Sequence, residues 1–144
     1  MKRFEEFVAE GKVIRRSQDP AEGASLLRQA KERLADLQRL PLDETSASFR
    51  FESAYEALRE ALQAFLAKAG YKPYSHEAVI AFAAEKRLLP EGNIMTADRY
   101  REIRNDINYR GKKVTRSEAE EIIAFVTRVV PELARRFQTM LGGE

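Results

Sequence analysis

Apolar residues recur every three or four positions along most of the chain, which is the spacing of helices that bury one face. The clearest stripe consists of Phe51, Tyr55, Leu58, Leu62 and Phe65. No segment shows the sustained alternation of apolar and polar residues that a half-buried strand requires. The pattern therefore predicts an all-α protein with helices at about residues 3–15, 20–40, 44–69, 76–88, 96–109 and 115–140.

Turn and capping residues separate these stripes. Asp19-Pro20 is typical of a helix start, because aspartate caps the first turn and proline suits the first helical position. Gly70 is typical of a helix end. Residues 89–93 contain proline and glycine and are expected to form a loop, with Thr96 capping the helix that follows.

A chain of 144 residues suits one domain, residues 1–144, and the predicted fold is an up-and-down bundle of five to six helices. Pro131 should kink the last helix, since proline removes one helical hydrogen bond. Residues 1–18 can be interpreted as an appendage on a bundle formed by 20–141.

Charge and composition narrow the functional classes. The 25 basic and 23 acidic side chains nearly balance, so nucleic-acid binding would need a local patch. The absence of cysteine excludes disulfides, thiolate catalysis and cysteine-based zinc sites. There is no apolar run long enough for a membrane helix and no apolar core of a signal peptide near Met1. We therefore expect a cytoplasmic protein without a membrane partner.

Few residues offer enzyme chemistry. The sequence contains no glycine-rich phosphate loop and no nucleophile elbow. The single histidine, His76, excludes histidine-rich metal sites, and it is interpreted as a packed or capping residue or as a general base without an evident partner. Glu118, Glu120 and Glu121 are interpreted as an acidic first helical turn rather than a metal site. No metal and no other cofactor is expected.

The strongest local positive charge lies in residues 98–116, where seven bases stand against three acids. Arginine can hold a phosphate through two parallel hydrogen bonds, and tyrosine offers a surface for base stacking. The interleaved polar and aromatic residues are Tyr100, Asn105, Asn108 and Tyr109. The alternative is a solvated helix with internal ion pairs, in which Asp98 and Glu102 bind Arg101 and Arg104.

Helical spacing places Tyr100, Arg104 and Asn108 in one row, beside an apolar row formed by Ile103 and Ile107. Arg104 and Asn108 therefore lie at the edge of the buried face. An arginine in this position must be paired or open to a groove. The apolar residues of this face are also a candidate homodimer surface.

Residues 104–109, Arg-Asn-Asp-Ile-Asn-Tyr, resemble the signature of the HEPN family (higher eukaryotes and prokaryotes nucleotide-binding). That signature is an arginine, a polar residue and, four to six positions after the arginine, a histidine. The long helix before Gly70 and the turn at Ser75-His76 are also similar to the family. The resemblance covers roughly residues 20–141 and implies a HEPN-like helical bundle.

In catalytic members of this family the arginine and histidine act together in metal-independent RNA cleavage, in a cleft at a dimer interface. Arg104 matches the arginine and Asn105 the polar residue, whereas Tyr109 stands where the histidine is expected. Tyrosine, with a pKa of about 10 in its unperturbed state, is a poor base at neutral pH. Tyr109 is equally compatible with a place in the core.

The resemblance therefore implies a non-catalytic module that binds RNA or a nucleotide, or a protein partner. Expected partners are a second copy of the chain or the other protein of a toxin–antitoxin or nucleotidyltransferase pair. The alternative is a ribonuclease built on Arg104 with Tyr109 or Asn108. The residues expected to bind RNA or nucleotide are Arg104, Asn105, Asn108, Tyr109, Arg110, Lys112 and Lys113.

Overall fold

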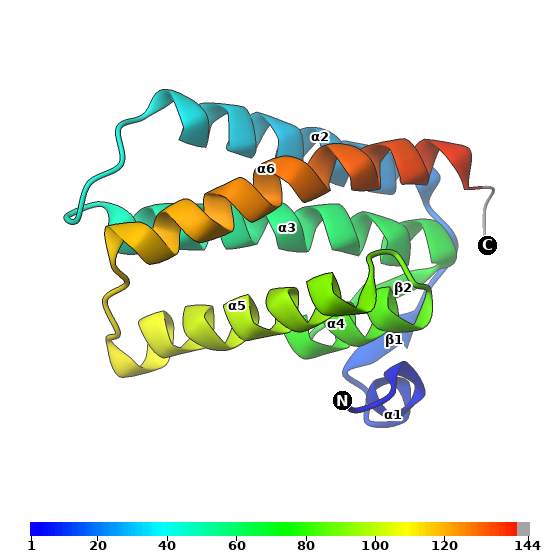
Figure 1. Cartoon of the computed structure of the whole chain (residues 1–144). Helices are drawn as coiled ribbons and strands as arrows, with labels where there is room; N and C mark the ends of the chain where they lie inside the picture. The colour runs from blue at the N-terminus through cyan, green and yellow to red at the C-terminus, as the bar shows by residue number, and fades with distance from the viewer. Residues whose placement is uncertain (141–144) are drawn as a thin grey trace.

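The structure, a computed structural model, describes residues 1–140 and contains six helices and one small sheet within them (Figure 1). The elements are α1 (Phe4–Ala9), β1 (Val13–Arg15), α2 (Pro20–Arg39), α3 (Ala47–Ala69), β2 (Tyr71–Pro73), α4 (His76–Glu85), α5 (Glu91–Arg110) and α6 (Arg116–Thr139). Helices α2, α3, α5 and α6 run in alternating directions. The predicted all-α bundle is confirmed.

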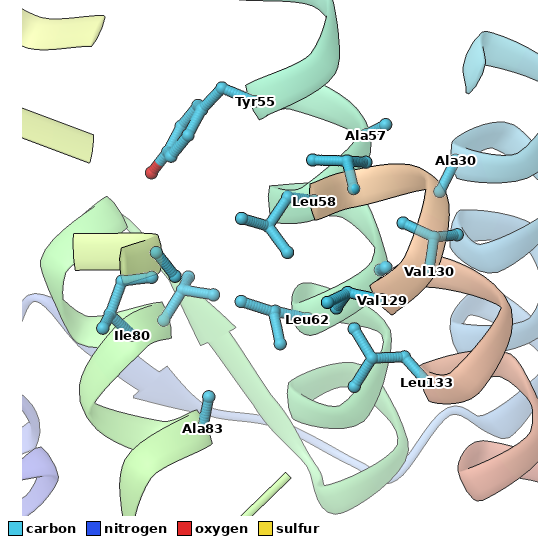
Figure 2. Packing of buried hydrophobic residues seen from close by; sticks show 14 of the residues in the cluster. Ala30, Tyr55, Ala57, Leu58, Leu62, Ile80, Ala83, Val129, Val130 and Leu133 are labelled. Atoms are coloured by element: carbon cyan, nitrogen blue, oxygen red, sulfur yellow. The ribbon is translucent and has the colours of Figure 1, made fainter. Parts of the chain in front are cut away.

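Helix α3 forms the centre of the bundle. It packs most extensively against α2 and α6, and α4 and α5 cover its other side (Figure 1). Figure 2 shows Leu58 and Leu62 of α3 between Leu133 of α6 and Ile80 of α4, and all four side chains are at most 2% exposed. Because α3 is buried on most of its surface, its sequence is rich in alanine and leucine, which permit close approach from several directions.

Two predicted helix boundaries, the start at Asp19-Pro20 and the end at Gly70, are confirmed. The Asp19 carboxylate accepts a hydrogen bond from the Glu22 amide at 3.0 Å, and Pro20 opens α2. Gly70 and Gly111 end α3 and α5 with φ angles of +96° and +67°, a left-handed conformation that glycine adopts without steric cost.

The prediction of a first helix over residues 3–15 is wrong beyond Ala9. Gly11 has a φ of +75° and turns the chain, and Val13–Arg15 then pairs antiparallel with Tyr71–Pro73. Strands of three residues are too short to show an alternating pattern, so this sheet could not be predicted from the apolar spacing. The Phe4 ring contacts Phe82 of α4 with 5.0 Å between centroids, so the first residues pack onto the bundle.

The predicted loop at residues 89–93 is wrong beyond Pro90. Helix α5 begins at Glu91 with Pro90 in the N-cap position, and Thr96 lies inside the helix, where its hydroxyl donates to the Gly92 carbonyl at 3.0 Å. Proline and glycine are tolerated in a first helical turn, where several amides have no helical partner, so the two residues did not mark a loop. Helix α6 continues through Pro131 to Thr139. Among the described helices, none combines the length and apolarity of a membrane span.

Candidate functional site

A pocket of about 360 Å³ lies where the start of α4 meets the second half of α5. It brings together two segments that are about 30 residues apart in sequence. Its lining residues are Tyr74, Ser75, His76, Glu77, Arg101, Arg104, Asn105 and Tyr109.

The small sheet and a helix cap position the first of these segments. The Tyr74 amide donates to the Lys12 carbonyl at 2.8 Å, which continues the pairing of β1 and β2 up to the start of α4. The Ser75 hydroxyl then accepts from the Ala78 amide at 3.3 Å and caps α4. The positive end of the α4 dipole therefore lies at the pocket, where it favours an anion.

Arg104 is the central residue of the second segment. It is half-buried and makes no ion pair with any residue in 1–140. In the amide orientation that satisfies its neighbours, Asn108 accepts from Arg104 Nη1 at 3.2 Å and Nε at 3.3 Å, and donates to Glu52 Oε1 at 3.2 Å. Asn108 thus holds Arg104 in place, and the guanidinium charge is left without a carboxylate partner.

Arg101 has a different environment. Its side chain is 13% exposed, and its Nε lies 2.8 Å from Asp98 Oδ1 and its Nη2 3.7 Å from Glu102 Oε1. Burial is the largest influence and disfavours the Arg101 charge, but the hydrogen bond to Asp98 and the negative charges of Asp98 and Glu77 together outweigh it and raise the arginine pKa. The interpretation of internal ion pairs is correct for Arg101 and wrong for Arg104.

His76 occupies the first position of α4 and faces the same pocket as Arg104. Its ring lies 6.0 Å from the ring of Tyr55, centroid to centroid. Burial lowers the His76 pKa below the usual 6.5, and the positive charges of Arg59 and Arg104 lower it further. The imidazole is therefore neutral at pH 7 and can accept a proton. Arg104 lines the same pocket, and this neighbour of His76 could not be identified from the sequence.

Two exposed tyrosines stand at the rim of the pocket. Tyr109 is 81% exposed and Tyr74 is 61% exposed, and they come from α5 and from the segment before α4. The alternative placement of Tyr109 in the core is wrong. The last three residues of α5, 108–110, are exposed, so the Tyr109 ring is open to a ligand.

Several residues of this site could not be identified as site residues from the sequence. Tyr74 and Arg101 line the pocket, and Tyr55 lies behind His76 as a buried side chain whose pKa burial raises to about 12. The pattern along α3 assigned Tyr55 to the core, which is correct. No signal in one sequence indicates that this core ring supports a histidine about 20 residues away.

Four of the expected binding residues do not line the pocket, namely Asn108, which binds Arg104, and three exposed basic residues. Arg110 and the loop residues Lys112 and Lys113 are exposed and follow the pocket-lining part of α5. Arg110 Nε lies 3.8 Å from Asp106 Oδ1, and Lys112 Nζ lies 3.8 Å from Glu118 Oε2. Their role in binding stays a prediction.

The apolar face considered for a homodimer is used within the chain. Tyr100 is 2% exposed, its ring contacts Phe125 of α6 at 5.5 Å, and its hydroxyl donates to Glu121 at 3.0 Å. Ile103 and Ile107 are partly buried and pack against the core. Tyr100 is therefore not available to a partner, whereas a homodimer that uses the partly buried Ile103 and Ile107 stays a prediction.

The acidic residues at the start of α6 have structural partners. Glu118 forms a capping box with Thr115, and Glu120 Oε1 accepts from Arg116 Nε at 2.9 Å. Glu121 binds Arg99 Nη2 at 2.8 Å. Within residues 1–140 no group of three or more histidine, aspartate or glutamate side chains is arranged to hold a metal ion.

Comparison with family models identifies the family of this chain. The family model described as HEPN domain matches residues 24–136, which include α3 to α5 and most of α2 and α6. The matched region contains every lining residue of the pocket between α4 and α5. No curated protein matches the chain.

Proposed function

The chain belongs to the HEPN domain family, and from this premise we propose that it binds single-stranded RNA, or a nucleotide, in the pocket between α4 and α5. Membership in the family implies a function related to nucleotides or RNA. The observation that supports this particular site is Arg104, a half-buried arginine without an ion pair to the described residues, which lines a pocket at a helix N-terminus.

The chemistry of the pocket suits one phosphodiester group. The Arg104 guanidinium can donate two hydrogen bonds to a phosphate, and the N-terminus of α4 adds a positive electrostatic potential that attracts it. The carboxylate of Glu77 also lines the pocket, so a phosphodiester with a single charge fits better than a dense cluster of phosphates. The exposed rings of Tyr74 and Tyr109 offer surfaces on which the neighbouring bases can stack.

RNA binding by the purified protein tests this proposal. A fluorescently labelled single-stranded RNA is titrated at about 50 mM and about 200 mM salt, because phosphate contacts weaken as salt rises. We expect Arg104→Ala to weaken binding about tenfold or more, since it removes a charge-assisted contact of about 1.5–3 kcal/mol.

The matched control is Arg135→Ala, which removes an exposed arginine of α6 that does not line the pocket. It should retain the affinity of the wild type. Equal losses in the two variants would show that only net charge matters, and unchanged binding by Arg104→Ala would refute the proposed site.

A second candidate function is RNA cleavage, and the shared pocket of His76 and Arg104 is the observation that favours it. A neutral His76 can take the proton of a ribose 2′-hydroxyl while that oxygen attacks the phosphorus. The bond from phosphorus to the 5′-oxygen then breaks, and the leaving oxygen takes a proton from water. Arg104 would stabilise the negative charge on the phosphate oxygens.

An RNA that lacks the reacting 2′-hydroxyl distinguishes cleavage from binding. If the protein cleaves RNA, we expect His76→Gln and a 2′-deoxy substitution in the RNA to abolish product formation without added metal, while binding remains. Intact RNA after prolonged incubation with the wild type would leave the non-catalytic module as the function. Product formation that persists in His76→Gln would remove the histidine from the mechanism.

We further propose that the module pairs with another protein, as the helical partner in a toxin–antitoxin or nucleotidyltransferase pair. The support is the family resemblance together with a bundle in which no residue of 1–140 completes a cysteine, zinc or phosphate-loop enzyme site. Affinity capture from the native cell extract tests it. Recovery of the chain alone would argue against a heteromeric pair.

A further inference from the structure

A second pocket, of about 420 Å³, lies between α2 and α3 on a part of the bundle that does not share residues with the pocket of Arg104. Its central feature is Arg50, in the first turn of α3, which is only 8% exposed. The Arg50 Nε has no hydrogen-bond partner, and the guanidinium makes no ion pair within the described residues 1–140.

Two acids of this pocket are bound by arginines other than Arg50. Glu60, also buried, accepts from Arg33 Nε at 2.9 Å, and Asp36 is bound by Arg39. Glu32 lies on the same stretch of α2 as Arg33 and Asp36, towards the Glu60 end of the pocket. The acids of the pocket therefore leave the Arg50 charge unpaired.

Asp43, an acid outside the pocket, also has another partner. The Asp43 carboxylate accepts from the Ser46 amide at 2.9 Å. Hydrogen bonds from Ser46 lower the Asp43 pKa, and the charge of Arg50 contributes only a smaller part. The Arg50 charge therefore affects the Asp43 pKa slightly, but the two residues do not form an ion pair.

Large apolar side chains surround the opening above Arg50. Phe49 is 65% exposed and Leu40 is 50% exposed, and both line the pocket. The Arg50 guanidinium lies 5.8 Å from the centre of the Phe49 ring. Arginine and aromatic residues beside a buried, desolvated centre are typical of the energetically important part of protein interfaces.

We propose that this pocket is a docking site for a partner protein, which inserts an aspartate or glutamate side chain to pair with Arg50 and packs an adjacent apolar side chain on Phe49 and Leu40. A buried guanidinium without a partner is costly, and a carboxylate satisfies it through two parallel hydrogen bonds. A carboxylate with one charge fits better than a phosphate with two, because Glu32 and Asp36 lie in the same pocket.

The test uses the whole chain and three probes, followed by amide chemical shifts in NMR titrations. The probes are a capped peptide with a glutamate next to a phenylalanine, the same peptide with glutamine, and free 3-phenylpropionate. We expect the glutamate peptide to shift resonances of residues 36–40 and 49–53, and the glutamine peptide to bind at least about tenfold more weakly.

Arg50→Met is the decisive variant, because methionine fills a similar volume without charge. It should bind the glutamate peptide at least about tenfold more weakly and keep the wild-type spectrum and melting temperature, since it removes a charge without a partner. Arg28→Met, an exposed arginine of α2 outside the pocket, is the control and should bind normally.

Three results would overturn the proposal. These are no shift at these residues with the glutamate peptide, equal binding of the glutamine peptide, and unchanged binding by Arg50→Met. Binding of 3-phenylpropionate without binding of the peptide would identify a site for small organic acids and would also refute a protein docking site. If Arg50→Met lost its folded spectrum, Arg50→Gln would take its place with the same expectation.

Discussion

Arg104 combines two properties that rarely occur together in a side chain needed only for folding. It is half-buried, yet its hydrogen-bond partner is the neutral amide of Asn108 rather than a carboxylate. Arg101, three residues earlier, is bound to Asp98 and has the arrangement expected of a structural arginine. The contrast between these two residues, one helical turn apart, is the reason to assign the ligand to Arg104.

We expect Asn108 to act on a bound RNA through Arg104. Because it bridges Arg104 and Glu52, we expect Asn108→Ala to release the guanidinium from its fixed position and weaken RNA binding by about 1 kcal/mol, a smaller loss than in Arg104→Ala. The double variant should bind no more weakly than Arg104→Ala alone, since the amide has no other route to the ligand. Additive losses in the anisotropy titration would show that Asn108 contacts the RNA itself.

The low pKa of His76 makes the stability of the protein depend on pH. In the unfolded chain the imidazole titrates near 6.5, whereas burial and the charges of Arg59 and Arg104 lower its pKa in the folded state. As the pH falls through 6.5 towards the folded pKa, the unfolded chain binds a proton that the folded chain does not. The free energy of unfolding therefore decreases with falling pH in this window.

We expect His76→Gln to remove this contribution. The melting temperature of the wild type should fall between about pH 7.5 and about pH 5.5 by more than that of the variant. Parallel changes in the two proteins would contradict the assignment of a neutral, desolvated histidine at the start of α4.

At the scale of elements, the position of α2 depends on one glycine. A Cβ atom on Gly23 would lie 2.8 Å from the backbone oxygen of Ala64 and 2.8 Å from the Phe137 ring, closer than such atoms approach. Helix α2 therefore contacts α3 and α6 directly at this point. Gly92, in the first turn of α5, has no atom within 4 Å of the corresponding position.

These two glycines give opposite predictions for the same substitution. Gly23→Ala should destabilise the fold by about 1–3 kcal/mol, because overpacking outweighs the better helix propensity of alanine. Gly92→Ala should be neutral or stabilise by up to about 1 kcal/mol. Denaturant unfolding of both variants measures the difference, and destabilisation by the same amount would contradict the close contact of α2 with α3.

The predictability of each element follows from its length. Helices α2, α3, α5 and α6 have 20 residues or more, so their apolar spacing was sufficient to identify them, although the start of α5 was predicted at Thr96 instead of Glu91. The strands β1 and β2 have three residues each and are stabilised by pairing between segments that are distant in sequence. A local sequence pattern cannot indicate which distant segments pair. The pairing of β1 with β2 also positions Tyr74 and His76, so their place in the pocket could not be predicted either.

At the scale of the molecule, the pocket of Arg104 exists only because the fold brings α4 to the second half of α5. The basic and aromatic composition of residues 98–116 identified one wall of the pocket correctly. The other wall, with Tyr74 and His76, could not be predicted because a lone histidine at a helix start is common. Conversely, Arg110, Lys112 and Lys113 have the expected charge but lie outside the pocket.

The same bundle carries a second unpaired arginine, Arg50, between α2 and α3. The two pockets differ in chemistry, since exposed tyrosines and a helix N-terminus mark one, whereas exposed apolar side chains mark the other. A protein that binds RNA in the pocket of Arg104 and a protein partner in the pocket of Arg50 would use both pockets. Each pocket can be inactivated separately by Arg104→Ala or Arg50→Met, so the two functions can be tested independently.

The central claim is that RNA occupies the pocket between α4 and α5, and NMR mapping of a bound single-stranded RNA tests it most directly. We predict that the amide resonances that shift on titration are those of residues 74–77 and 101–109, and that Arg104→Ala suppresses these shifts. Shifts confined to residues 110–116 would place the RNA on the basic loop, and no shifts at all would show that this protein does not bind RNA through its folded domain.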